Sequence, residues 1–111
     1  MADVYGRLTG KAGVCLGTLG PGATNLVTGV ADANMDRAPV VAIIGQGSTE
    51  RLHKESHQIM DSISMVNPKS KWAQTILSAK NITEVIRKAF KVAETEKPVV
   101  TVIEFPEDIA K

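Results

Sequence analysis

The chain has one cysteine and few aromatic residues, and its charges nearly cancel. Cys15 is the single cysteine in 111 residues, so no internal disulfide can form, and a reducing compartment suits the chain best. Aromatic residues make up 4%, and 13 basic residues stand against 12 acidic ones, for a net charge of +1. Both features argue against a nucleic-acid partner, which needs a basic surface or aromatic stacking platforms.

Long apolar runs are missing as well. None approaches the roughly 18 residues of a membrane span, and the first residues lack the apolar centre of a signal peptide. We therefore expect a cytoplasmic protein with neither a membrane nor a nucleic acid as partner. With 43% hydrophobic residues, the chain has enough apolar surface for one domain with its own core. Cys15 lies in an apolar run and is interpreted as a small core residue.

What the sequence does contain is a glycine-rich stretch, Gly17 to Asn25, between an apolar run and a segment with helical periodicity. Such a turn from strand to helix presents backbone N–H groups to a ligand, often an anion. Gly17 and Gly22 have the spacing of a nucleotide-binding P-loop, and Thr24 occupies its Ser/Thr position. The position that requires lysine is Ala23, so the main charge contact of a P-loop is absent.

The fingerprint of dinucleotide-binding proteins matches this stretch only in part. Gly20 and Gly22 have its Gly-x-Gly spacing, but Asn25 stands where a third small residue belongs. Asp32 and Asp36 come too early for the ribose-binding acid, which lies about 20 residues on. They are interpreted as the polar face of a helix. Neither motif identifies a ligand, and a tight turn without one stays open on the local sequence.

Short runs rich in apolar and β-branched residues predict the strands. Three are clear and one is weaker: Gly13 to Thr18, Pro39 to Ile44, Val99 to Phe105 and, as the weaker candidate, Trp72 to Leu77. The run at Pro39 to Ile44 has no polar residue, as expected of a strand covered on both faces.

Helical patterns lie between these strands. One covers Ala23 to Met35 and another Ile82 to about Glu96, with Asn81 as predicted N-cap and Glu84 at the capping-box position. A short helix at Ala2 to Leu8 has nothing before it to pack against. Strands alternating with helices predict an α/β fold, a three-layer sandwich with a mainly parallel sheet. In such sheets, ligands bind at the carboxyl ends of the strands.

Five segments together resemble one family. They are Gly6 to Lys11, Gly20 to Leu26, Gly29 to Ala33, Pro39 to Gln46 and Ile103 to Ile109. In this order they are similar to the N-terminal pyrimidine-binding domain of thiamine diphosphate enzymes, specifically the acetolactate synthase and pyruvate oxidase family. The resemblance implies that residues 1–111 form a single partial domain of this kind. It would lack the domain's first strands, the middle domain and the diphosphate-binding domain.

The resemblance also implies a role for the glycine-rich stretch. In this family the cofactor lies across a dimer interface: one subunit holds its pyrimidine ring, and the diphosphate-binding domain of the other holds the diphosphate with Mg²⁺. Pro21, Gly22 and Asn25 match positions on the pyrimidine and thiazole side, and Gln58 matches a glutamine that reaches the active site. These four are the expected cofactor-binding residues. The family's activating glutamate precedes the position of Met1, so no catalytic residue or metal ligand is expected here, and FAD use stays open.

The chain departs from the family pattern at a few positions. His57 stands where an aromatic residue is common, and Lys97 replaces a glycine before the last strand. His53, Glu55 and His57 are spaced somewhat like a zinc helix, but their order is not His-Glu-x-x-His, so zinc is not expected. His57 is interpreted as a solvated loop residue, with an active-site donor in a full-length enzyme as the alternative.

Two hypotheses of different classes follow. In the first, the chain is a fragment of an acetolactate synthase-like enzyme, which decarboxylates pyruvate and joins the two-carbon unit to a second 2-oxo acid. The fragment alone is expected to be inactive, and pyruvate oxidase, glyoxylate carboligase and benzoylformate decarboxylase chemistries stay open for the full-length relative. The alternative is a non-catalytic oligomerisation module, because a truncated sheet exposes an edge and apolar surface. A homo-oligomer is expected.

Overall fold

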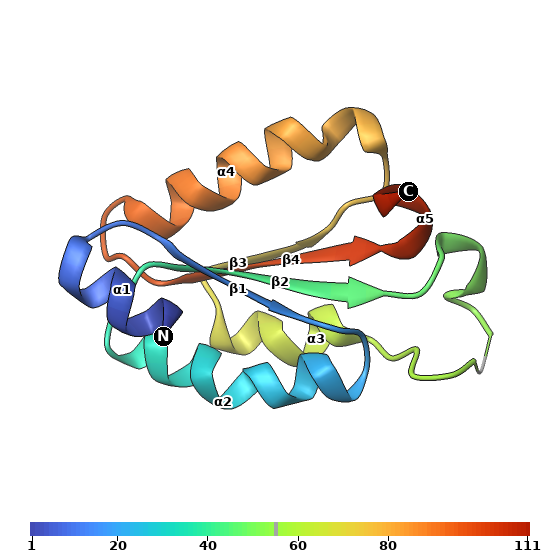
Figure 1. Ribbon diagram of the computed structural model, residues 1–111, viewed down its shortest axis with the longest axis horizontal. Helices are drawn as coiled ribbons and strands as arrows, with labels where there is room; N and C mark the ends of the chain where they lie inside the picture. The colour runs from blue at the N-terminus through green and yellow to red at the C-terminus, as the bar shows by residue number, and fades with distance from the viewer. Residues whose placement is uncertain (55) are drawn as a thin grey trace.

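A parallel sheet forms the centre of the molecule. The structure is a computed structural model that describes residues 1–54 and 56–111. The four strands lie in the order β1-β2-β4-β3 (Figure 1). Their bounds are β1 (Gly13–Gly17), β2 (Val40–Gln46), β3 (Trp72–Thr75) and β4 (Val100–Pro106). Each arises where a strand was predicted, although β1 and β3 end earlier than expected.

Helices cover both faces of this sheet. One face carries α2 (Pro21–Met35) and the short α3 (Ser62–Val66), and the other carries α4 (Ile82–Glu94), as Figure 1 shows. The remaining helical segments are α1 (Ala2–Thr9), α5 (Glu107–Ala110) and three 3₁₀ turns at Thr49–Arg51, Asn67–Lys69 and Ala79–Asn81. The predicted α/β three-layer sandwich is therefore confirmed. Neither α3 nor α5 was predicted, because each is too short to show a helical period.

The two faces carry separate apolar cores. On the α2 side, small residues of the helix let it lie close to the sheet; the buried set is Ala23, Val30, Ala33, Ala38, Val40, Ala42, Ile44, Val66, Val100 and Val102. On the α4 side the buried set is Ala12, Val41, Ile76, Ala89, Ala93 and Ile103. Strand β4, although last in the sequence, lies between β2 and β3 because its side chains are buried on both faces.

The ends of α4 are held differently from the prediction. Asn81 is the N-cap, but its side chain makes no capping hydrogen bond. It belongs to a 3₁₀ turn with ψ −2°, whereas a capping side chain needs an extended backbone, so the capping-box prediction is wrong. Ser78 Oγ instead accepts from Lys80 N at 3.4 Å. At the other end, Lys71 Nζ donates to the carbonyls of Val92, Thr95 and Glu96 at 3.1, 2.9 and 3.0 Å.

The N-terminal helix α1 packs against segments that follow it in the sequence. Gly6 is buried against Pro39, and a Cβ at Gly6 would lie 2.5 Å from the Pro39 carbonyl oxygen. Arg7 forms ion pairs with Asp3 at 2.9 Å, Asp32 at 3.2 Å and Asp36 at 2.6 Å. The hydrogen bond to Asp3 and the neighbouring carboxylates raise the pKa of Arg7. Asp32 and Asp36, which come too early in the sequence to bind the ribose of a dinucleotide, thus hold α1 against α2.

Cys15 lies partly buried on β1, packed beside the α2-side core, and burial raises the pKa of its thiol. Its interpretation as a small apolar residue matches this position. Within the described part of the chain, no helix combines the length and the apolar character that crossing a membrane requires.

Candidate functional site

The glycine-rich stretch forms the turn between β1 and α2, at the carboxyl edge of the sheet. Gly20 is the N-cap of α2 with φ +55° and ψ −117°, a conformation that side chains disfavour, and Pro21 starts the helix. Pro21 has no N–H, and the N–H of Gly22 donates to the Leu19 carbonyl at 3.2 Å. Two of the first three helical positions therefore offer no free donor. The turn is poorly suited to a phosphate.

Absent side chains let this turn fold tightly against its neighbours. A Cβ at Gly17 would lie 2.7 Å from Leu26 Cδ1, and one at Gly22 would overlap Thr18 Cγ2. Behind the turn, a Cβ at Gly45 would lie 3.3 Å from the Leu19 nitrogen, so the end of β2 supports it. The glycines thus serve close packing of the backbone.

Gln58 comes to this turn from a distant part of the sequence. A Cβ at Gly20 would lie 2.6 Å from the Gln58 carbonyl oxygen and 2.8 Å from Gln58 Cβ. Gln58 itself is exposed, with φ +61°. Pro21 and Asn25 are exposed too, four residues apart on the same side of α2. The structure thus brings three of the four expected residues together at the turn, and Asn25 lies one helical turn further along.

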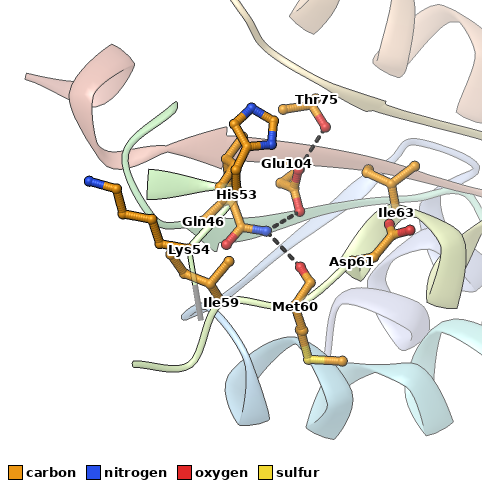
Figure 2. A pocket seen from close by; sticks show the side chains of 10 residues that line it. Gln46, His53, Lys54, Ile59, Met60, Asp61, Ile63, Thr75 and Glu104 are labelled. Carbon is orange, nitrogen blue, oxygen red and sulfur yellow. Dashed lines mark hydrogen bonds between the residues drawn. The ribbon is translucent and has the colours of Figure 1, made fainter. Parts of the chain in front are cut away.

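A second polar cluster lies at the same edge of the sheet, beyond β2, and Figure 2 shows it. Gln46 Nε2 donates to Glu104 Oε1 and to the Met60 carbonyl, both at 2.9 Å. Glu104 Oε2 accepts from Thr75 Oγ1 at 2.6 Å. Gln46 and Glu104 are each only 4% exposed. Side chains of β2, β3 and β4 therefore meet in one hydrogen-bonded cluster.

This cluster lines a cavity of about 410 Å³, together with His53, Lys54 and Asp61. Asp61 accepts from Ser64 N at 3.0 Å and from Ser64 Oγ at 2.6 Å, which lowers the pKa of its carboxyl. The cluster was not predicted. Its signal in the sequence is a polar residue inside an apolar run: Glu104 interrupts the last strand.

A further contact ties the segment after β2 to α5. Asp108 accepts from Thr49 N at 3.0 Å and from Thr49 Oγ1 at 2.5 Å, and these bonds lower the pKa of Asp108. His57 is exposed, and His53 lines the cavity described above. Glu55, the third residue of the zinc-like spacing, lies outside the described residues. Among those described, no three His, Cys, Asp or Glu side chains gather as metal ligands would.

The chain is similar to known proteins over nearly its whole length. A family model described as "Thiamine pyrophosphate enzyme, N-terminal TPP binding domain" matches residues 1–65. A probable acetolactate synthase large subunit of Methanococcus aeolicus is 44% identical over 108 residues, which are 97% of this chain and 18% of the relative.

Two bacterial relatives also match nearly the whole chain over a small part of their own length. A catabolic acetolactate synthase of Raoultella terrigena is 42% identical, over 98% of this chain and 20% of its own length. An acetolactate synthase of Bacillus subtilis is 39% identical, over 98% of this chain and 19% of its own length. The chain thus spans about a fifth of the relatives it matches. It belongs to the thiamine pyrophosphate enzyme family and corresponds to the N-terminal thiamine pyrophosphate-binding domain of acetolactate synthases.

Proposed function

We propose that this chain supplies the pyrimidine side of a thiamine diphosphate site in an acetolactate synthase-like enzyme. The observation that carries this proposal is the packing of Gln58 on Gly20, directly before Pro21. Two segments far apart in sequence thereby meet at the carboxyl edge of the sheet, one carrying an amide side chain and the other followed by a proline. Thiamine diphosphate would supply the nucleophilic carbon that adds to a 2-oxo acid.

The residues at the turn fit a flat heteroaromatic ring better than a phosphate. Pro21 offers an exposed apolar surface, and Asn25 and Gln58 each offer an exposed amide that can donate and accept. Gly22 lets the turn pack closely on Thr18, which sets the course of the backbone beneath this surface. These four residues would hold and orient the pyrimidine. The diphosphate and Mg²⁺ would be held by another domain, the diphosphate-binding domain, with which this chain would associate.

The first test is a titration of the chain with thiamine, which has the pyrimidine but no diphosphate. We expect the ¹⁵N amide signals of Gly20, Gly22 and Gln58 to shift with a dissociation constant in the millimolar range, about −4 kcal/mol. Gln58→Ala should weaken this binding, and Gln74→Ala, at an exposed glutamine on β3, should not. Equal binding by both variants, or no shift in the unchanged chain, would contradict the proposal.

Catalysis is tested separately. Glu104 is buried, and both of its oxygens accept hydrogen bonds from its neighbours Gln46 and Thr75. We therefore expect the purified chain, supplied with thiamine diphosphate and Mg²⁺, to form no acetolactate from pyruvate. Turnover above the cofactor-only control would show that the chain carries a catalytic group of its own.

A second candidate function, an oligomerisation module, is favoured by the free edge of β1. Leu16 is 76% exposed on the α4 side of this strand, and Leu8 of α1 is 82% exposed. Backbone groups of alternate residues point to opposite sides of a strand, so those of Val14 and Leu16 face away from β2. Such an edge can pair with a second copy of the chain.

Sedimentation of matched variants tests this alternative. Leu16→Lys places a charge on the free edge and should convert a homo-oligomer to monomer. The control is Leu77→Lys, at a leucine that is 69% exposed beside the opposite edge of the sheet. A monomeric unchanged chain, or equal effects of the two substitutions, would count against the module.

A further inference from the structure

Glu104 is a carboxylate buried inside an otherwise apolar strand. It is 4% exposed, and each of its oxygens accepts one hydrogen bond, from Gln46 Nε2 and Thr75 Oγ1. Both partners are neutral, although burying a carboxylate without a cation is costly. Neither partner supplies a positive charge to offset the cost of burying the carboxylate. The carboxylate therefore requires a reason other than packing.

Gln46 links Glu104 to the loop that follows β2. The structure describes this loop, residues 47–60, at 47–54 and 56–60. Gln46 Oε1 accepts from the Gly47 N–H at 2.9 Å, at the start of the loop. Gln46 Nε2 donates to the Met60 carbonyl at 2.9 Å, at its end. One side chain thus ties together both ends of the loop, and Glu104 fixes the orientation of its amide, because only Nε2 can donate.

From Met60, the loop leads back to the glycine-rich turn. Ile59 packs on Gly47, where a Cβ would lie 2.8 Å from Ile59 Cδ1. Gln58 packs on Gly20, as described above. The contacts therefore run without a break from Glu104 through Gln46 and the end of the loop to the turn.

We propose that Glu104 is a positioning residue, which acts through Gln46 to fix the end of the loop and so keeps Gln58 against Gly20. The loop position itself follows from contacts within the chain. The effect of Glu104 on ligand binding rests on the proposed function, because the position of Gln58 affects binding only if a ligand occupies the turn.

Native-state amide exchange of the ¹⁵N-labelled chain tests the positioning. The reporters are the N–H groups of Gly47, Ile59 and Ser62, which donate to Gln46 Oε1, Ser56 O and Met60 O. Glu104→Met removes both acceptors, and we expect about tenfold faster exchange at these three amides. Glu104→Gln keeps an oxygen for Gln46 and can donate to Thr75, so exchange should stay within about twofold of the unchanged chain.

The control is Thr101→Val on the same strand. Thr101 is fully buried on the opposite face and donates to the Ala89 carbonyl at 3.1 Å, so this change also deletes a buried hydrogen bond, away from the loop. If Glu104→Met speeds the three loop amides no more than Thr101→Val does, or Glu104→Gln fails to restore them, the proposal is wrong.

Thiamine titration of the same variants separates this inference from the proposed function. If the unchanged chain binds thiamine, Glu104→Met should weaken binding about tenfold and Glu104→Gln should restore it. Unchanged affinity in Glu104→Met would overturn the link between loop and ligand. If the unchanged chain does not bind, the proposed function fails, and the exchange experiment still decides whether Glu104 positions the loop.

Discussion

The two polar regions at the carboxyl edge of the sheet are built in opposite ways. In the glycine-rich turn, missing side chains let backbone segments approach, and the polar side chains of Asn25 and Gln58 are exposed. In the cluster of Gln46, Thr75 and Glu104, side chains are buried and hydrogen-bonded to one another. The turn therefore depends on the close approach of its backbone, and its polar side chains face solvent. The cluster depends on paired polar atoms and holds the loop in place.

The largest effect should come from adding a side chain to the turn. Gly20→Ala forces a Cβ into a disfavoured backbone conformation and against the Gln58 carbonyl, and we expect a loss of about 3 kcal/mol of unfolding free energy. Gly29→Ala is the control. Gly29 lies on the exposed side of α2, and a Cβ there would have no atom within 4 Å. It should stabilise by roughly 0.5–1 kcal/mol in urea titrations. Equal changes in unfolding free energy for the two variants would show that the close contacts at Gly20 do not stabilise the turn.

The second largest effect should come from the buried cluster, where we expect the stability losses at Gln46 and Glu104 to be coupled. Gln46→Leu leaves one oxygen of the buried Glu104 without its partner and should cost about 2 kcal/mol. Glu104→Met should cost a similar amount, about 2 kcal/mol. The double variant should lose at least about 1 kcal/mol less than the sum, because no buried polar group in that pair stays unpaired. Additive losses in urea titrations would mean that the two side chains act independently.

A matched pair of threonines compares the two regions directly. Thr75 Oγ1 donates to Glu104 at 2.6 Å within the cluster, and Thr24 Oγ1 donates to the Pro21 carbonyl at 2.9 Å on the exposed turn. We expect Thr75→Val to cost about 1 kcal/mol and Thr24→Val less than about 0.5 kcal/mol, because water replaces the exposed bond. Thermal unfolding of both variants measures the difference. The reverse order would contradict the comparison.

The smallest effect should be the loss of stability at low pH through Asp108. The hydrogen bonds from Thr49 lower the pKa of Asp108 below its usual 3.8 in the folded chain. Between that lowered pKa and 3.8, the unfolded chain binds more protons, so stability rises with pH there and levels off above it. We expect the melting temperature to fall as pH drops below about 4, and to fall less steeply in Asp108→Asn. An unchanged slope would show that this contact carries no stability.

How far the site could be predicted depends on how each part is encoded. The turn was predicted because its glycines lie within six residues of one another, between a strand pattern and a helix pattern. Gln58 was predicted only through the family resemblance, and the structure brings it to the turn. Glu104 was overlooked, because one acidic residue in an apolar strand gives no hint of its partner on β2. Asn81 is the N-cap as predicted, but the predicted capping box is absent, because a 3₁₀ turn changes the backbone conformation of Asn81.

The sequence by itself determined the family, the strands and long helices, and the parallel α/β architecture, because these depend on local periodicity and contiguous residues. Only the tertiary structure decided that β4 lies between β2 and β3, that Arg7 docks α1 onto α2, and that Glu104 faces Gln46. These depend on which strands become neighbours. The physical reason is burial on both faces of β4, which draws the last strand to the centre and brings its carboxylate to the end of β2.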